Sequence, residues 1–342
     1  MEKPRLSRTH AVSARPPRAG PAKRSASRSP AAPRASFSCQ IPPGADGSAA
    51  SAHSCLAGAL ETRWHCYREQ LRICREDFSE EGVHELRVAA RRLIAQLVLL
   101  GCVMHSAGLE KARRILKRRM AALGELRDTH VQRAFVAAHV ARFPDLALLD
   151  AWLERRERRL AGQAARQPGL FKARKLEKWL RALSSDLGAK SRGAPALRRL
   201  TSAAIKATDD AFARAIERRR AIDPADPRTI HQTRVSFKRF RYMVESLSPD
   251  LTGLSKRQLR ALAYYQRRMG IIQDMEVLGT CVARFIRENP EAEAPLRPFA
   301  AHLRRRQTLA QRSFLKTADR LFGFWPPAQL MAPGPAASGN RT

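Results

Sequence analysis

Two blocks of sequence occur twice along this chain, in the same order and at nearly the same spacing. Residues 83–93 read VHELRVAARRL and residues 230–240 read IHQTRVSFKRF, while LGELRD at 123–128 is matched by MGIIQD at 269–274. Two blocks repeated in order are hard to produce by chance, and 342 residues leave room for two halves of about 140 residues each. That is the size of one helical bundle, so the sequence predicts a tandem duplication.

Helical periodicity runs through the chain after its first 50 residues, and no segment alternates as a strand does. Aromatic residues make up only 6% of the chain, and its 18 Gly and 21 Pro are few for a protein of many turns. We therefore predict an all-α fold of two pseudo-symmetric tandem helical bundles of the four-helix type. The predicted helices, separated by Gly, Pro, Ser or Asp, span residues 54–76, 83–101, 109–122, 129–142, 146–162, 170–186, 195–221, 228–247, 255–270, 275–288 and 296–322.

The ends of the chain differ from its middle in composition. Residues 1–51 are predicted to be a disordered basic tail, because the first 50 residues contain seven Arg, two Lys and eight Pro without apolar periodicity. A mitochondrial presequence has a similar composition, but these prolines interrupt any amphipathic helix. The predicted domain covers residues 52–322, with one half at about 52–167 and the other at about 168–322. Residues 323–342 are predicted to be a disordered C-terminal tail.

Each repeated block predicts a helix with two contrasting faces, because positions i, i+3, i+4 and i+7 lie together on a helix. Ser79 and Asp226 are the expected N-caps, so both helices present a positive end beside their basic residues. The basic faces are His84, Arg87 and Arg91 in the first copy and His231, Arg234, Lys238 and Tyr242 in the second. The opposite faces are Leu86, Leu93, Leu97 and Leu100 in the first copy and Thr233, Phe237, Phe240, Val244 and Leu247 in the second.

The basic residues outnumber any acids that could pair with them. The chain has 64 Lys and Arg against 31 Asp and Glu, a formal charge of +33. Residues 82–134 hold 11 Lys and Arg against four Asp and Glu, and residues 227–274 hold ten against three. A solvent-exposed helix face stabilised by i,i+4 ion pairs would need acidic residues to pair with these cations. Without them, like charges about 6 Å apart repel by roughly 3 kcal/mol at an effective dielectric near 20. The two basic faces, which we call the basic stripes, are therefore predicted to bind a polyanion.

Histidine, aspartate and glycine residues of the blocks carry further hypotheses. His84 and His231 lie among the cations, so we expect them to donate hydrogen bonds to phosphate; a phosphorylated histidine is the alternative, and a metal site lacks converging ligands. Asp128 and Asp274 are expected to be N-caps, with orientation of a stripe arginine as the alternative. The paired glycines before them, Gly124 and Gly270, are expected to mark a helix end or close helix packing.

The paired motif H-x-x-R-V-x-x-[KR]-R, each copy followed by an L-G-x-x-x-D-like block, resembles the CHAD family (conserved histidine α-helical domain) over about residues 52–322. The resemblance implies two four-helix bundles whose basic helices line a central groove, and non-enzymatic binding of inorganic polyphosphate, often at polyphosphate or polyester storage granules. Ile94 departs from the family pattern, which usually has another basic residue there. At matching positions the resemblance implies polyphosphate-binding roles for His84, Arg87, Arg91, Arg92, His231, Arg234, Lys238, Arg239, Arg241 and Tyr242. To these we add three nearby basic residues as candidates to complete the groove: Arg114, Arg118 and Arg127.

No catalytic motif accompanies these blocks. The string nearest to the ExExK signature of a CYTH domain, at residues 291–295, ends in proline, and Walker, paired-carboxylate and Ser/His/Asp patterns are missing from the sequence. We therefore expect a binding protein that is not an enzyme and uses no cofactor or metal. Nucleic-acid binding through the same cations is the alternative; it calls for aromatic stacking residues, of which Tyr242, Tyr264 and Tyr265 are the plausible ones.

The sequence also bears on where the protein acts. The longest apolar stretch, at residues 93–104, has 12 residues and is too short to span a membrane, and the N-terminus has no apolar signal core. Six cysteines at irregular spacing specify neither a disulfide framework nor a zinc site, and are expected to be scattered thiols. We therefore expect a cytoplasmic protein, and the resemblance implies association with granules.

Overall fold

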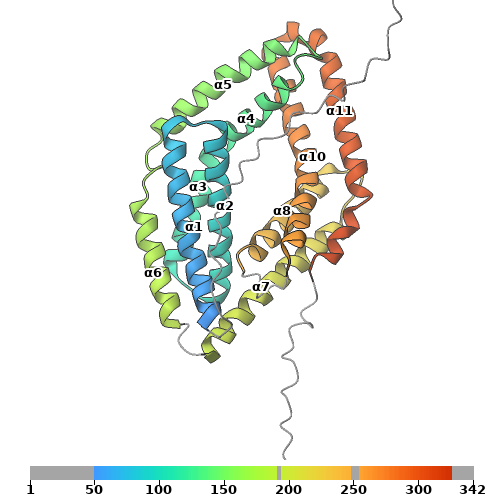
Figure 1. The fold of residues 1–342 in the computed structure, drawn as a ribbon. Coiled ribbons are helices and arrows are strands. Elements are labelled where there is room, and N and C mark those ends of the chain that lie inside the picture. Colours follow the sequence, from blue (N-terminus) through green and yellow to red (C-terminus); the bar gives the residue numbers. More distant parts are fainter. Residues whose placement is uncertain (1–49, 191–193, 248–253, 326–342) are drawn as a thin grey trace, which may run out of the picture. The chain divides into compact units, whose positions relative to one another are not determined.

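A computed structural model of the protein describes residues 50–190, 194–247 and 254–325, all within one compact unit of the chain. Every regular element in these ranges is helical, which confirms the all-α prediction (Figure 1). The predicted tails at 1–51 and 323–342 lie almost entirely outside the described residues. The elements are α1 (Ala50–Asp77), α2 (Glu80–Val103), α3 (Ala107–Ala122), α4 (Gly124–Ala137), α5 (Leu146–Arg166), α6 (Arg174–Lys190), α7 (Ala194–Arg220), α8 (Pro227–Val244), α10 (Lys256–Glu288), α11 (Glu293–Leu315) and the short 3-10 helices η1 (Pro290–Ala292) and η2 (Ala318–Gly323).

The two motif helices, α2 and α8, begin as the sequence predicts. Ser79 caps α2 by accepting a hydrogen bond of 3.1 Å from the Gly82 N–H. Asp226 caps α8 by accepting one of 3.0 Å from the Arg228 N–H, and Pro227 occupies the first turn, where a missing N–H costs nothing. The predicted apolar faces of both helices are buried, so the opposite, basic faces point away from the core.

One long helix stands where the sequence predicts two. The break expected between residues 270 and 275 is absent, and α10 continues through it. Ile272 and Met275 in this stretch are buried, and tertiary packing of such side chains outweighs the weak helix propensity of a single internal glycine. The prediction of separate helices at 255–270 and 275–288 is therefore wrong.

Two hydrophobic cores hold the described residues together. The larger one draws mainly on α1, α2, α3, α6, α7, α8, the first half of α10 and η2, with single buried residues from α4, α5 and α11 (Leu126, Ala164 and Phe314). The smaller one is formed by α4, α5, the second half of α10 and α11. The helix α6 follows residue 167, where the sequence places the end of the first half, yet it packs against α1 and α3 (Figure 1).

Two sequence-level observations on membranes and cysteines can be compared with the structure. Within the described ranges, no helix combines the length and the apolar character needed to cross a membrane. Cys74, Cys102 and Cys281 carry free thiols, as expected. Cys66 is disulfide-bonded, so the expectation of unpaired thiols is wrong at that position.

A candidate anion-binding site

A cavity of about 550 Å³ lies where α2, α3 and α8 meet, and we call it the central pocket. Six of its lining residues are Lys or Arg, and none of those that the structure describes around it is Asp or Glu. The cations come from both motif helices and from α3, so neither copy of the repeat forms the site alone. The lining consists of Arg87, Arg91, Ile94, Ala95 and Val98 of α2, Arg113, Lys117, Met120 and Ala121 of α3, Gly124 of α4, and Val235, Lys238, Arg239, Tyr242 and Met243 of α8.

A direct side-chain contact joins the two motif helices across this pocket. The Nε of Arg91 on α2 donates a hydrogen bond of 3.1 Å to the hydroxyl of Tyr242 on α8. Tyr242 is only 7% exposed, and the guanidinium of Arg241 lies 4.7 Å from its ring centroid. The ring is therefore held in place, and its hydroxyl is the part that faces the site.

The first arginine of each motif is seated against the second block of its own copy. A side chain at Gly124 would come 4.0 Å from an Nη of Arg87, and one at Gly270 would come 3.7 Å from the Nε of Arg234. Arg87 also donates a hydrogen bond to the backbone oxygen of Met120. Both distances are ordinary contacts, so neither position requires a glycine for close packing. Gly124 begins α4 directly after the end of α3, as expected for a helix end, whereas Gly270 lies inside α10, where that expectation is wrong.

Asp128 and Asp274 do not cap helices, so that prediction is wrong. Asp128 lies inside α4 and Asp274 inside α10, where the backbone N–H groups are already used by the helix. Burial raises the pKa of both carboxyls, and the neighbouring guanidinium, Arg87 for Asp128 and Arg234 for Asp274, acts to lower it. Each arginine acts on the charge of its aspartate without a hydrogen bond or ion pair among the described residues, so orientation of a stripe arginine stays a prediction.

Like charges act strongly on one another in this site. Burial, and after it the repulsion from surrounding cations that include Arg91, Arg234 and Arg87, lowers the pKa of Lys238 to about 8. Burial also lowers the pKa of Arg87 and of Arg234, with Arg91 acting in the same direction on both. A site in which cations depress one another's pKa is short of negative charge, and a bound anion would relieve that repulsion.

The motif histidines lie at the edge of the cationic stripe and do not line the central pocket. His84 is half-buried, and burial together with Arg127 and Arg91 lowers its pKa to about 4, so the ring is neutral at pH 7. The Nδ1 of His231 donates a hydrogen bond to the side-chain oxygen of Gln273 on α10. Within the described residues no group of three or more His, Cys, Asp or Glu side chains is placed to hold a metal ion.

Several other predicted site residues lie outside the central pocket. Arg127 forms an ion pair of 3.0 Å with Glu80 at the start of α2. Arg241 pairs with Glu245 at 3.2 Å, and Arg92 is close enough to Arg63 to lower the pKa of that guanidinium. The pocket thus contains, of the predicted residues, Arg87, Arg91, Lys238, Arg239 and Tyr242.

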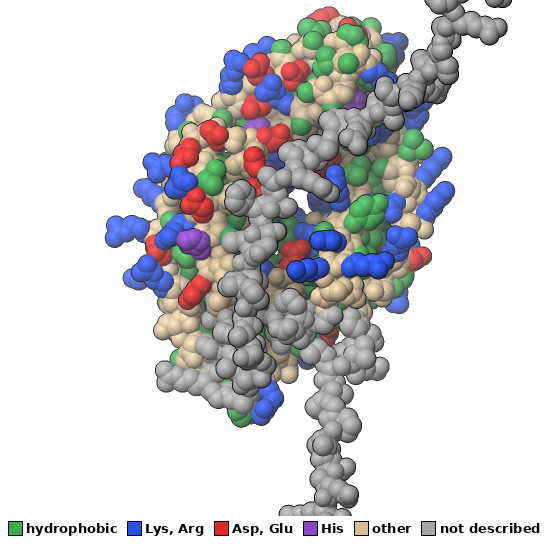
Figure 2. Space-filling view, viewed as in Figure 1, with side chains coloured by type: hydrophobic (Ala, Val, Ile, Leu, Met, Phe, Trp, Pro, Cys, Tyr) green, Lys and Arg blue, Asp and Glu red, His purple; other side chains and the backbone are tan. Residues whose placement is uncertain are grey.

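On α3 the residues in the pocket are one position away from those that the sequence suggested. Arg113 and Lys117 line it, whereas Arg114 and Arg118 are exposed on a neighbouring face of the helix. Positions 113, 117 and 120 share one face of α3, and nothing in the sequence of α3 marks this face as the one that meets the pocket. Figure 2 shows an opening near the middle of the molecule with Lys and Arg side chains along its edge.

Comparison with known proteins identifies the fold and the family. A model of the CHAD domain matches residues 58–283, well over half of the chain and including both motif helices. The chain belongs to the CHAD domain family. The match takes in the helices that form the central pocket of this CHAD protein, so its basic residues lie within the family's own region.

Solved structures resemble this CHAD protein in fold. The CHAD domain of the plant Ricinus communis superposes with a TM-score of 0.57 at 19% identity, covering 77% of this chain and 91% of that one. PptA from Streptomyces chartreusis gives a TM-score of 0.51 at 19% identity, covering 78% of this chain and 99% of that one. No curated protein matches the chain in a sequence comparison.

Proposed function

We propose that this CHAD protein binds inorganic polyphosphate in the central pocket. The observation that carries the proposal is the convergence of six cations from three helices on one cavity whose described lining contains no carboxylate. Polyphosphate is a linear anion with about one charge per phosphate, and Arg and Lys donate charge-assisted hydrogen bonds to its oxygens. The CHAD membership supports this ligand, since the resemblance in the motifs implies polyphosphate binding.

The lining favours binding without a chemical step. Its side chains are cationic, aliphatic or thioether apart from the Tyr242 hydroxyl, so none can act as a carboxylate or imidazole base toward a bound phosphate. We therefore propose a binding protein that is not an enzyme. Recruitment to polyphosphate granules would follow directly from such binding.

The aromatic side chains support polyphosphate over nucleic acid. Base stacking needs exposed aromatic faces beside the cationic groove. Tyr242 and Tyr265 are buried, and the Tyr265 hydroxyl donates to the backbone oxygen of Ala318. Tyr264 is 61% exposed but does not line the central pocket, which leaves this pocket without a stacking platform.

A charge-matched pair of variants tests the proposal. The central variant combines Lys117→Glu, Lys238→Glu and Arg239→Glu. The control variant makes the same change of charge at exposed arginines of α5 and α11 that line none of the pockets described here, Arg155→Glu, Arg304→Glu and Arg305→Glu. Both are made in the full chain, so the basic residues 1–51 contribute equally to each.

Calorimetric titration with long-chain polyphosphate, tripolyphosphate and duplex DNA provides the measurement. We expect the central variant to lose at least about 100-fold in affinity for long-chain polyphosphate, because three charge-assisted contacts are each worth about 1.5 kcal/mol or more. The control should stay within about threefold, since isolated surface charges contribute little. Equal losses in the two variants, or tighter binding of DNA than of polyphosphate by the wild type, would overturn the proposal.

A further inference from the structure

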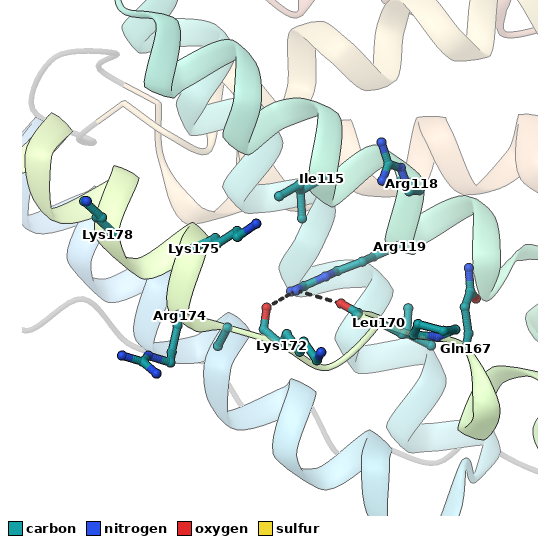
Figure 3. A pocket seen from close by; sticks show the side chains of 12 residues that line it. Ile115, Arg118, Arg119, Gln167, Leu170, Lys172, Arg174, Lys175 and Lys178 are labelled. Carbon is teal, nitrogen blue, oxygen red and sulfur yellow. Dashed lines mark hydrogen bonds between the residues drawn. The ribbon is translucent and has the colours of Figure 1, made fainter.

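A second basic cavity, of about 820 Å³, lies on a different face of α3, and we call it the outer pocket. It is enclosed by α3, by the loop at residues 167–173 and by the first turns of α6 (Figure 3). Its volume falls within the range of about 300–1,000 Å³ found for ligand sites. It shares no lining residue with the central pocket. Its cations are Arg118, Arg119, Lys172, Arg174, Lys175 and Lys178.

Arg119 brings a buried positive charge to this pocket, and among the residues that the structure describes no carboxylate pairs with it. The residue is 7% exposed, and its guanidinium donates to the hydroxyl of Tyr67 at 2.9 Å and to the backbone oxygens of Gly169 and Lys172 (Figure 3). Its Nε is buried without a hydrogen-bond partner. Burial raises the pKa of Tyr67, so this phenol stays neutral and does not compensate the charge. A buried charge held only by neutral groups calls for a counter-anion nearby.

The start of α6 adds donors to the same cavity. The first N–H groups of a helix have no acceptor within it and present a partial positive charge. In α6 these N–H groups come directly after the loop that contains Lys172. Lys175 extends from the first turn of α6 toward the Arg119 side of the pocket (Figure 3). Glu177, the acidic residue of this turn, does not line the pocket and pairs with Arg181 at 2.7 Å.

We propose that the outer pocket is a second oligophosphate-binding site. This inference rests on the proposed function, since it assigns the same class of ligand to a separate cavity. A phosphate group accepts several hydrogen bonds at once, which matches a buried guanidinium, free helix N–H groups and a rim of lysines. Lys117 of the central pocket and Arg118 of the outer pocket are neighbours on α3, so the ligand comes either as a free oligophosphate or as the continuation of a chain bound centrally.

Hydrogen–deuterium exchange of the full-length protein locates this binding directly. The outer variant combines Lys172→Glu, Lys175→Glu and Lys178→Glu, three exposed residues, and is compared with the wild type and with the central and control variants above. Tripolyphosphate and long-chain polyphosphate are the probes. We expect peptides covering residues 167–178 to exchange at least about fivefold more slowly with ligand, because the free amides at the start of α6 become hydrogen-bonded. The outer variant should lose this protection, and the control should keep it.

The pattern across probes and variants separates the outcomes. Protection by tripolyphosphate that persists in the central variant supports a pocket for free oligophosphate. Protection by the long chain alone, lost in the central variant, supports a chain that continues from the central pocket. No slowing at residues 167–178 with either probe, or equal slowing in the outer variant, overturns the proposal. If the central pocket does not bind the ligand, peptides of α2 and α8 would show no slowing of exchange, whatever happens at residues 167–178. The two proposals are therefore distinguishable.

Discussion

The Nε of Arg91 donates a hydrogen bond of 3.1 Å to the hydroxyl of Tyr242, and this contact joins the two motif helices across the central pocket. The two residues are far apart in the sequence and belong to different copies of the repeat. Their contact helps to hold the two basic stripes in position relative to one another. A site that is already arranged spends less free energy on ordering when it binds.

Removing the Tyr242 hydroxyl tests this arrangement. We expect Tyr242→Phe to lower the free energy of unfolding by about 1 kcal/mol, the usual worth of one hydrogen bond, and to weaken polyphosphate binding about two- to fivefold. Urea unfolding and calorimetric titration measure the two effects. Tyr264→Phe, at an exposed tyrosine outside the pocket, is the matched control and should change neither quantity. Unchanged values in Tyr242→Phe would mean that the contact is incidental.

Binding should be linked to proton uptake through Lys238. Its pKa is about 8 in the free protein, below the usual 10.5, and a bound polyanion raises it. The complex therefore holds a proton that the free protein loses as the pH rises through 8, so affinity falls above that pH. The free protein should gain stability over the same range, because the unfolded chain keeps that proton up to about pH 10.

Calorimetric titration at pH 8.5 in buffers of different ionisation enthalpy measures the proton uptake. The variant Lys238→Arg keeps the positive charge but does not titrate in this range, and should abolish most of the uptake. Equal uptake in the two proteins would assign the proton to another group.

The space beside Gly270 should set what α10 tolerates. A Cβ there would lie 3.7 Å from the Nε of Arg234, an ordinary contact, whereas at Gly279 of the same helix it would meet nothing within 4 Å. We expect Gly270→Ala and Gly279→Ala each to raise stability by about 0.5–1 kcal/mol, as in other helix interiors. Gly270→Leu should displace Arg234 and weaken polyphosphate binding about tenfold or more, while Gly279→Leu leaves binding unchanged. Equal affinity for polyphosphate in the two leucine variants would show that the position of the Arg234 side chain does not affect binding.

Salt should weaken polyphosphate binding in proportion to the number of cations engaged. By analogy with counterion release from nucleic acids, the logarithm of affinity should fall linearly with the logarithm of salt concentration. The slope should be shallower by about two to three in the central variant, which removes three cations, and unchanged in the control variant. Titrations between 50 and 400 mM salt measure the slopes, with these concentrations chosen as roughly bracketing physiological ionic strength. A flat response in the wild type would indicate a ligand held mainly by apolar contacts.

Gly169 should be required for the loop that shapes the outer pocket. Its φ of +80° lies in the left-handed region, which glycine adopts readily and other residues adopt at a cost. We expect Gly169→Ala to lower the free energy of unfolding by about 1 kcal/mol, in contrast to the gain expected for Gly279→Ala. Denaturant unfolding of both variants provides the check, and a stabilised Gly169→Ala protein would contradict the expectation.

The sequence predicts the motif helices well because their pattern has a single physical reading. A helix with an apolar face and an opposite cationic face can pack in only one orientation, with the apolar face toward the core. The N-caps Ser79 and Asp226 depend only on residues next to them in the sequence. The all-α fold follows from the same periodicity. These local rules place Arg87 and Arg91 on the basic face of α2, and the approach of α3 and α8 forms the pocket around them.

The errors arise where partners distant in the sequence decide the outcome. Asp128 and Asp274 resemble N-caps locally, yet each lies inside a helix, in the electrostatic field of an arginine more than 35 residues away in the sequence. The sequence predicts Arg114 where the pocket contains Arg113, because the direction from which α8 approaches α3 is not encoded within α3. The outer pocket was missed for the same reason, since Arg119 meets a loop some 50 residues further along.

The uninterrupted α10 has a consequence for how the protein comes apart. With 33 residues it is a rod of about 50 Å. Its first half belongs to the larger core and its second half to the smaller one. Neither core can melt while the other stays intact without fraying this shared rod in the middle, so a single cooperative transition is expected. A ligand that stabilises the packing of α8 against the first half of α10 is therefore expected to slow the local unfolding of α5 and α11. These two helices pack against the second half of α10 and do not contact the ligand.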